Sequence, residues 1–157
     1  MVSKLYLEKA QNEFELARII KQITEDEQMQ KEAFKVSNTL TFYSAVISHS
    51  YYCIFYSAKA YLSKKGITIS SPEEHRKTYE AIKKSVDNGE LDVELLMLYE
   101  KVLVKADTLL GIFKIEKKKR GEFTYQKLAQ ANKEPAEESI DHAKTFFKHV
   151  YGLCDSD

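Results

Sequence analysis

Residues 44–62 constrain the fold more than any other part of the sequence. The stretch reads SAVISHSYYCIFYSAKAYL, with Tyr51, Tyr52, Tyr56 and Tyr61 set among small residues and no glycine or proline. Apolar residues fall on nearly every side of a helix drawn through it, which is typical of a helix surrounded by other helices. Small residues let neighbouring backbones approach, and tyrosine fills gaps while keeping a polar tip for a partner. The stretch therefore predicts a helix buried inside a helical fold.

The composition favours helices throughout a single domain. The chain has 157 residues, of which 43% are hydrophobic and 31% charged, with only five glycines and two prolines. So few turn residues disfavour a β-sandwich or barrel and favour long helices. We expect one all-α domain over residues 1–157, built as an antiparallel up-and-down bundle of four to five helices.

The cysteines and apolar runs bear on the location of the protein. Cys53 lies in the apolar stretch and Cys154 in a polar tail, so a disulfide framework is not expected. No cysteine–histidine spacing suits zinc. The first residues lack the apolar core of a secretion signal, and no apolar run reaches membrane-spanning length. We expect a cytoplasmic protein with no membrane contact, no metal and no cofactor.

Apolar periodicity and capping signals place the helices. Ser71-Pro72-Glu73-Glu74 reads as a serine N-cap, proline at the first helical position and a capping-box glutamate at the third. Gly66 is expected to cap the preceding helix. Residues 24–31 either continue the first helix or loosen it, and residues 151–157 are expected to fray. The expected helices are residues 3 into the twenties, 36–39 to 64, 71–87, 92–115, a shorter piece over 123–131, and 135 onward.

Two histidines, His49 and His75, are candidates for a site or a cleft. His49 lies in the tyrosine-rich helix, and His75 lies one turn into the next helix. A functional interpretation makes His49 a base or ligand and His75 a catalytic residue. We favour structural roles for both. The helix of His49 then forms a helix–helix seam whose hydroxyls bond to neighbouring backbone, and His75 packs across the bundle as a neutral imidazole near a helix N-terminus.

One segment of this neutral chain is locally basic. Residues 101–133 carry nine cations and three anions, a net charge of +6. The best candidate site in the segment consists of Lys117, Lys118, Lys119, Arg120 and Tyr125. An arginine can hold a phosphate as a planar fork, lysines add long-range attraction, and tyrosine can stack on a base. The alternative is a solvated loop whose charges are balanced by the acidic residues that follow: Glu134, Glu137, Glu138 and Asp141.

These elements, in this order, resemble the HEPN domains of bacteria and archaea. The resemblance rests on the tyrosine-rich helix with its closing glycine, the histidine that opens the next helix, and a late arginine and tyrosine before a final helix. The matching residues are Ala45, Tyr51, Tyr52, Cys53, Phe55, Ala58, Ala60, Leu62, Gly66, His75, Arg120, Tyr125, Ile140, Ala143 and Phe146. The resemblance implies a bundle of four to five helices that is usually a homodimer.

The same resemblance implies two kinds of function. Many members of the family are metal-independent endoribonucleases, with an arginine, four to six intervening residues and then a histidine, paired across the dimer cleft. Others are non-catalytic binding modules, and many lie beside a small nucleotidyltransferase as toxin–antitoxin pairs.

This chain departs from the ribonuclease pattern. Its arginines are Arg18, Arg76 and Arg120, and none is followed by a histidine at that spacing. After Arg120, Tyr125 is one of the residues at the spacing where the family has its histidine. A tyrosine with a pKa of about 10 is a poor general base at neutral pH. The sequence therefore favours a non-catalytic module for RNA, a nucleotide or a partner protein. The alternative is a ribonuclease toxin with an altered Arg120–Tyr125 site.

Overall fold

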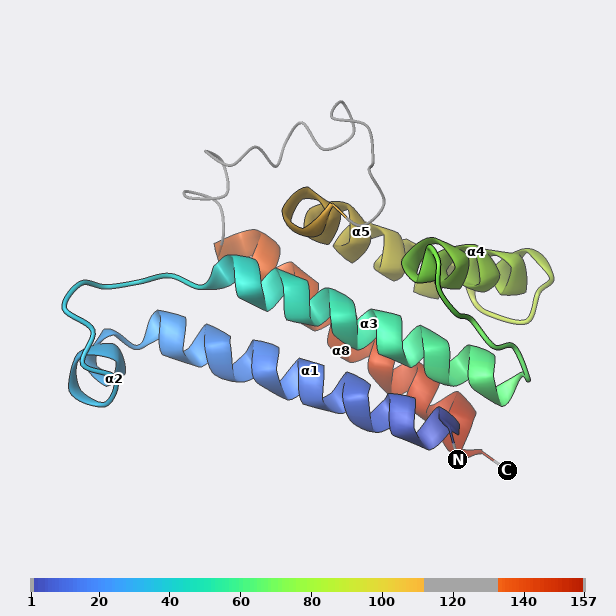
Figure 1. Ribbon diagram of the computed structural model, residues 1–157, viewed down its shortest axis with the longest axis horizontal. Helices are drawn as coiled ribbons and strands as arrows, with labels where there is room; N and C mark the ends of the chain where they lie inside the picture. The colour runs from blue at the N-terminus through green and yellow to red at the C-terminus, as the bar shows by residue number, and fades with distance from the viewer. Residues whose placement is uncertain (1, 112–132, 157) are drawn as a thin grey trace.

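The computed structural model describes residues 2–111 and 133–156, which form helices joined by loops (Figure 1). These helices are α1 Val2–Glu25, α2 Glu27–Glu32, α3 Tyr43–Lys64, α4 Glu74–Asp87, α5 Val93–Leu110 and α8 Lys133–Asp155. The described residues contain no strand, so the expected all-α helical bundle is confirmed. Within these ranges, no helix has the length and apolar character needed to cross a membrane.

Helix α3 is the central element of the bundle. It contacts α1, α4, α5 and α8. In Figure 1, α1 and α5 run opposite to α3 and α8, and α4 and α5 lie on the side of α3 away from α1. The chain begins and ends at the same end of the bundle. The burial of the tyrosine-rich helix among other helices is therefore confirmed.

Small side chains allow α1 to pack closely on α3. Ala10, Ala17 and Thr24 recur every seven residues on α1 and are buried. The Ser3 hydroxyl donates to the carbonyl of Ala60 across this contact, at 3.0 Å. Because these side chains are short, the two backbones can approach closely along the length of α1.

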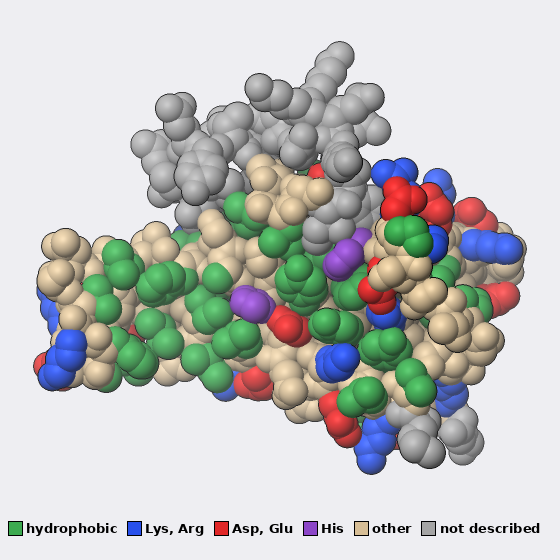
Figure 2. All heavy atoms as spheres, in the orientation of Figure 1, with side chains coloured by type: hydrophobic (Ala, Val, Ile, Leu, Met, Phe, Trp, Pro, Cys, Tyr) green, Lys and Arg blue, Asp and Glu red, His purple; other side chains and the backbone are tan. Residues whose placement is uncertain are grey.

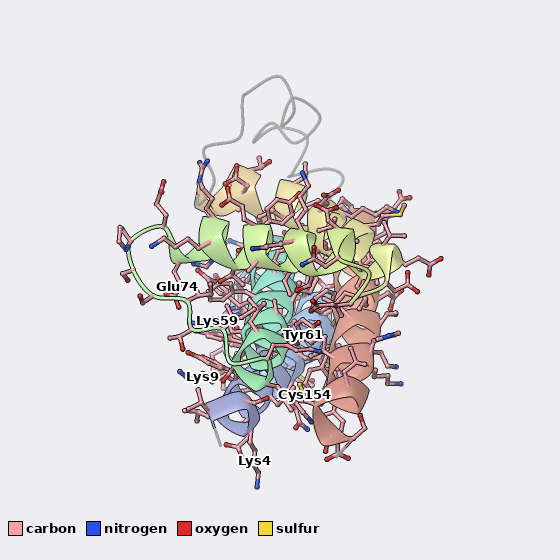
Figure 3. The ribbon with its side chains drawn as sticks, turned by 90° about the vertical axis from the view of Figure 1, so that its right-hand side faces the viewer. Lys4, Lys9, Lys59, Tyr61, Glu74 and Cys154 are labelled. Atoms are coloured by element: carbon pink, nitrogen blue, oxygen red, sulfur yellow. The ribbon has the colours of Figure 1, made fainter. Side chains whose placement is uncertain are left out.

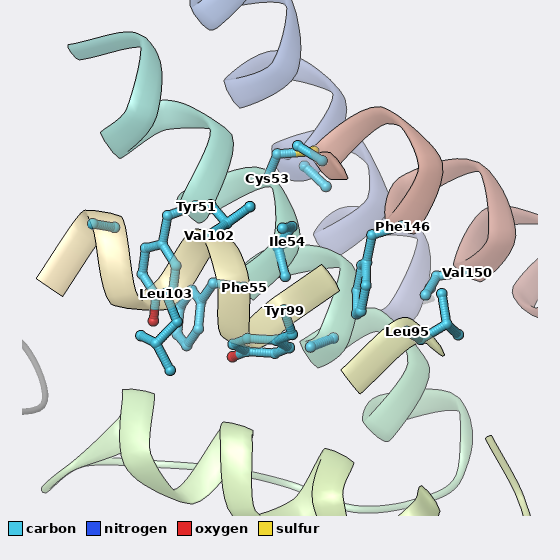
Figure 4. Close-up of a cluster of buried hydrophobic side chains, with 14 of the residues drawn as sticks. Tyr51, Cys53, Ile54, Phe55, Leu95, Tyr99, Val102, Leu103, Phe146 and Val150 are labelled. Atoms are coloured by element: carbon cyan, nitrogen blue, oxygen red, sulfur yellow. The ribbon is translucent and has the colours of Figure 1, made fainter. Parts of the chain in front are cut away.

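Aromatic and branched side chains from three helices fill the core (Figure 4). The Tyr99 ring of α5 meets the Phe146 ring of α8 edge-on, with 5.7 Å between centroids. Cys53 of α3 is buried here, and burial raises the pKa of its thiol to about 12. A thiol with that pKa stays protonated at neutral pH and acts as a small apolar group. Fully buried core side chains include Tyr51, Ile54, Tyr99, Val102 and Phe146.

Helix α3 begins later than the sequence predicts, and a contact distant in sequence explains the difference. The Gln30 side chain donates to the carbonyl of Leu40 at 3.0 Å and accepts from its amide at 2.9 Å. The Phe42 amide donates to the Thr24 hydroxyl at 3.0 Å. These bonds occupy backbone groups that a helix over residues 36–42 would use itself, so α3 starts at Tyr43.

Two helix ends also bear on the predictions. Helix α5 ends at Leu110, where Gly111 has a left-handed φ of 62°, and the expected helical residues 112–115 and 123–131 lie outside the described residues. Helix α8 continues to Asp155, so the expected fraying of residues 151–157 is wrong as far as Asp155. The Lys64 ammonium donates to the Cys154 carbonyl at 2.6 Å, which ties this end of α8 to α3.

Candidate functional site on the α1, α3 and α4 face

The start of α4 places His75 against α3. Ser71–Pro72 is a cis peptide bond, Glu73 has a φ of 56°, and the helix begins at Glu74. The predicted capping box is wrong, because Glu73 occupies the N-cap position without a side-chain cap bond. The Glu74 carboxylate that the capping box requires binds the Lys59 ammonium of α3 instead. A tertiary ion pair therefore replaces the local cap and brings His75 over the tyrosine-rich helix.

His75 is half-buried between aromatic side chains of α3. Its Nδ1 lies 2.7 Å from the Tyr51 hydroxyl, and its ring stacks on Phe55 with 4.1 Å between centroids. Burial lowers the pKa of His75; the charge of Lys59 adds a smaller lowering, and the charge of Glu74 raises the pKa slightly. Burial also raises the pKa of Tyr51 far above its ordinary value. The imidazole is therefore neutral at neutral pH, and its Nδ1 shares a hydrogen bond with the Tyr51 hydroxyl.

Lys59 is a charged residue inside the apolar helix. It pairs with Glu74 (Figure 3), and its ammonium lies 4.7 Å from the centre of the Tyr6 ring. Burial alone would lower the pKa of Lys59, but its hydrogen bonds to Glu74 and Tyr6 raise the pKa above its ordinary value. Lys59 therefore stays charged and joins α1, α3 and the start of α4.

His49 links α3 to α1 at the middle of the bundle. Its Nδ1 lies 2.5 Å from a carboxylate oxygen of Glu13, and both side chains are partly exposed. The neighbouring ring of Tyr52 lies 6.5 Å away, centroid to centroid. On this face of the molecule, histidine side chains reach the surface among hydrophobic ones (Figure 2).

The pairing of these groups limits their chemistry. His49 binds Glu13, His75 binds Tyr51, and Lys59 binds Glu74. Because its pKa is raised, the Tyr51 hydroxyl stays protonated and is a poor nucleophile. The described residues also hold no group of three or more metal-ligating side chains. The network connects three helices.

A second charged cluster lies between α5 and α8. The Lys105 ammonium is buried and donates to Glu138 at 2.6 Å, beside Lys101 and His142. Burial lowers the pKa of His142, and the two lysines lower it further. Lys105 is one of the nine cations of the basic segment, so part of that positive charge is balanced within the bundle, as one interpretation of the sequence expects.

The candidate site residues predicted from the sequence fall into two groups, those outside the described residues and those within them. Lys117, Lys118, Lys119, Arg120 and Tyr125 lie outside the described residues. His49 and His75 lie on one face of the bundle, each with a partner that sequence reasoning missed. For Glu13 no sequence signal was available, since its role depends on how α1 packs on α3. Lys59 did carry a signal, because a lysine within a buried apolar helix needs a carboxylate nearby.

Comparison with known families identifies the fold. The model of the HEPN domain family matches residues 27–153. The chain belongs to the HEPN family. This match covers α2 to most of α8 and leaves α1 of this HEPN protein outside it. Neither a curated protein nor a solved structure matches the chain. HEPN domains often oligomerise or pair with partners.

Proposed function

We propose that this HEPN protein is a non-catalytic binding module whose ligand carries phosphate, either RNA or a nucleotide. One observation carries the proposal: no arginine of the chain is followed by a histidine after four to six residues. The side chains of His49 and His75 contact Glu13 and Tyr51, and both lie on the face of α3. Without a histidine at that spacing after an arginine, the family's general base is missing.

The phosphate contacts are assigned to the basic cluster of the sequence. Arg120 supplies a planar fork and the preceding lysines supply long-range attraction, while Tyr125 stacks on a base or donates its hydroxyl. The support is the net charge of +6 over residues 101–133 in an otherwise acidic chain. The phosphate-contacting lysines are Lys117, Lys118 and Lys119.

A binding experiment tests this assignment. RNA and mononucleotide affinity are measured at two salt concentrations for wild type, Arg120→Ala and Arg18→Ala. We expect Arg120→Ala to bind about tenfold more weakly, since it loses a charge-assisted hydrogen bond. Arg18, an exposed arginine paired with Glu15 on α1, is the matched control and should leave affinity unchanged. Wild-type affinity should fall as salt rises. Equal affinity of wild type and Arg120→Ala would refute the site.

The proposal extends to partners. We infer a cytoplasmic homodimer that also associates with a nucleotidyltransferase, as one component of a toxin–antitoxin pair. The support is membership of the HEPN family, in which association with partners is common. Co-expression with the product of the neighbouring gene, followed by co-purification, tests the second association.

The runner-up function is a metal-independent endoribonuclease. The observation in its favour is that Arg120 keeps Tyr125 at the spacing where the family places its histidine. This function predicts RNA cleavage by the purified protein in the presence of a chelator, and loss of growth on expression. Intact RNA after long incubation excludes it.

A further inference from the structure

Helix α1 carries an exposed stripe that its packing in the bundle does not use. Val2, Leu5, Leu16 and Ile19 remain 40% to 55% exposed. With Lys9 and Asn12 they follow alternating steps of three and four residues, the repeat of a coiled-coil seam. We call these six residues the outer stripe. Apolar residues at such positions normally face another helix.

Apart from Lys9, whose ammonium lies over the Tyr56 ring of α3, the outer stripe is separate from the surface that holds α1 in the bundle. The buried residues Ala10, Ala17 and Thr24 lie on a different side of the helix and pack within the bundle. The outer stripe also lies outside the part of the chain that matches the HEPN family, which begins at residue 27.

The order of residues along the outer stripe is self-complementary. It reads apolar, apolar, Lys9, Asn12, apolar, apolar. We propose that the outer stripe packs against the outer stripe of a second copy, antiparallel, about a two-fold axis between Lys9 and Asn12. Each layer then joins residues of one kind. The layers pair Val2 with Ile19, Leu5 with Leu16, and Lys9 with Asn12 of the second copy.

Other arrangements of the same two helices are less favourable. A parallel pair places Lys9 against Lys9 of the second copy, which repels. An antiparallel pair shifted by one heptad buries Lys9 against Ile19 and Asn12 against Leu16, leaving polar groups without partners. In the proposed register, Lys9 lies near Glu8 and Glu15 of the second copy, which flank Asn12 one helical turn away on each side. Charge and polarity therefore select one register.

The neighbouring aromatic residues widen the contact. The outer stripe spans about 26 Å from Val2 to Ile19, at 1.5 Å per residue. Tyr6 of α1 stacks on Tyr56 of α3 with 6.3 Å between centroids, and the Lys9 ammonium lies over both rings. These rings border the outer stripe at Lys9 and are therefore placed to widen the contact.

This inference rests on the proposed homodimer for its stoichiometry, and it places the contact on α1 rather than at the cleft across which the family pairs its arginine–histidine sites. It is independent of the proposed ligand. Association is its readout, whereas the readout of the proposed function is RNA or nucleotide affinity with Arg120→Ala. Either can fail while the other holds.

The mass in solution is the first test. Light scattering at micromolar concentration is compared for wild type, Leu16→Glu and Gln11→Glu. Gln11 is exposed on α1 outside the outer stripe, and its substitution introduces the same charge. We expect dimers for wild type and Gln11→Glu, and a monomer with unchanged helical circular dichroism for Leu16→Glu. A monomeric wild type, or a dimer that survives Leu16→Glu, overturns the interface.

Cross-linking tests the register and does not depend on a destabilising substitution. Leu5→Cys and Leu16→Cys are made with Cys154→Ser and tagged differently, then oxidised alone and mixed. The proposed register predicts a cross-link between Leu5→Cys and Leu16→Cys. It predicts none for Leu5→Cys alone, since the two copies of residue 5 lie about 16 Å apart along the axis. A self-cross-link of Leu5→Cys, or no cross-link in the mixture, overturns the register.

Discussion

His75 shows how one residue couples a helix terminus to the core. Its ring stacks on Phe55, and its Nδ1 meets the hydroxyl of the fully buried Tyr51. Burial lowers the pKa of His75, so the imidazole prefers to be neutral in the folded state. A neutral imidazole can share a hydrogen bond with the Tyr51 hydroxyl through its Nδ1.

The lowered pKa makes stability depend on pH in a defined direction. The unfolded chain protonates His75 near its ordinary pKa of 6.5, while the folded chain does so at lower pH. The unfolded state therefore binds more protons below pH 6.5, and the free energy of unfolding falls as pH falls from 6.5 through the folded pKa. We expect His75→Gln, whose amide can still form a hydrogen bond with Tyr51, to flatten this decline.

Urea unfolding at several pH values between 7 and 5 measures the effect. Part of the decline should remain in His75→Gln, since burial also lowers the pKa of His142. Identical slopes for wild type and His75→Gln would contradict the assignment.

At the scale of elements, each helix boundary depends on either local or distant contacts. The end of α3 was predictable, because Gly66, with a φ of 78°, is a local signal. The start of α3 was not, since Gln30 holds Leu40 through two hydrogen bonds. The start of α4 was missed because Glu74 pairs with Lys59, which lies 15 residues earlier. Pattern reasoning finds signals within one turn and misses contacts that require the packed bundle.

Glycine substitutions test the corrected end of α8. Gly152 lies inside the helix, and an added Cβ would meet nothing within 4 Å. Gly152→Ala should therefore raise the free energy of unfolding by about 0.5–1 kcal/mol. Gly66→Ala is the opposing control and should lower it by a comparable amount, because alanine tolerates a positive φ poorly. Thermal unfolding of both variants checks this, and a destabilised Gly152→Ala would mean that α8 ends earlier.

At the scale of the whole molecule, α3 organises both the core and the candidate site. Its contacts with α1, α4, α5 and α8 explain why one apolar stretch predicted the fold class so well. The same stretch predicted less of the site. His49 and His75 could be named from the sequence, but Glu13 could not, because its pairing arises only when α1 packs on α3. The position of a residue within a helix is local information, whereas its neighbour on another helix is not.

The core should unfold as one unit, and Phe146 is the side chain that tests this. Phe146 is fully buried on α8 and meets Tyr99 of α5, whereas the adjacent Phe147 is only partly buried. Phe146→Ala leaves a cavity between two helices and should cost about 3–5 kcal/mol. Phe147→Ala, the matched control, should cost less than half as much, since less of its ring leaves water.

Urea unfolding followed by circular dichroism and by tyrosine fluorescence separates two outcomes. If the helices form one core around α3, both signals shift together in Phe146→Ala, because loss of the α5–α8 contact weakens every helix at once. Two separated transitions in wild type, or equal losses for the two phenylalanines, would show that α8 contributes to stability independently of α5.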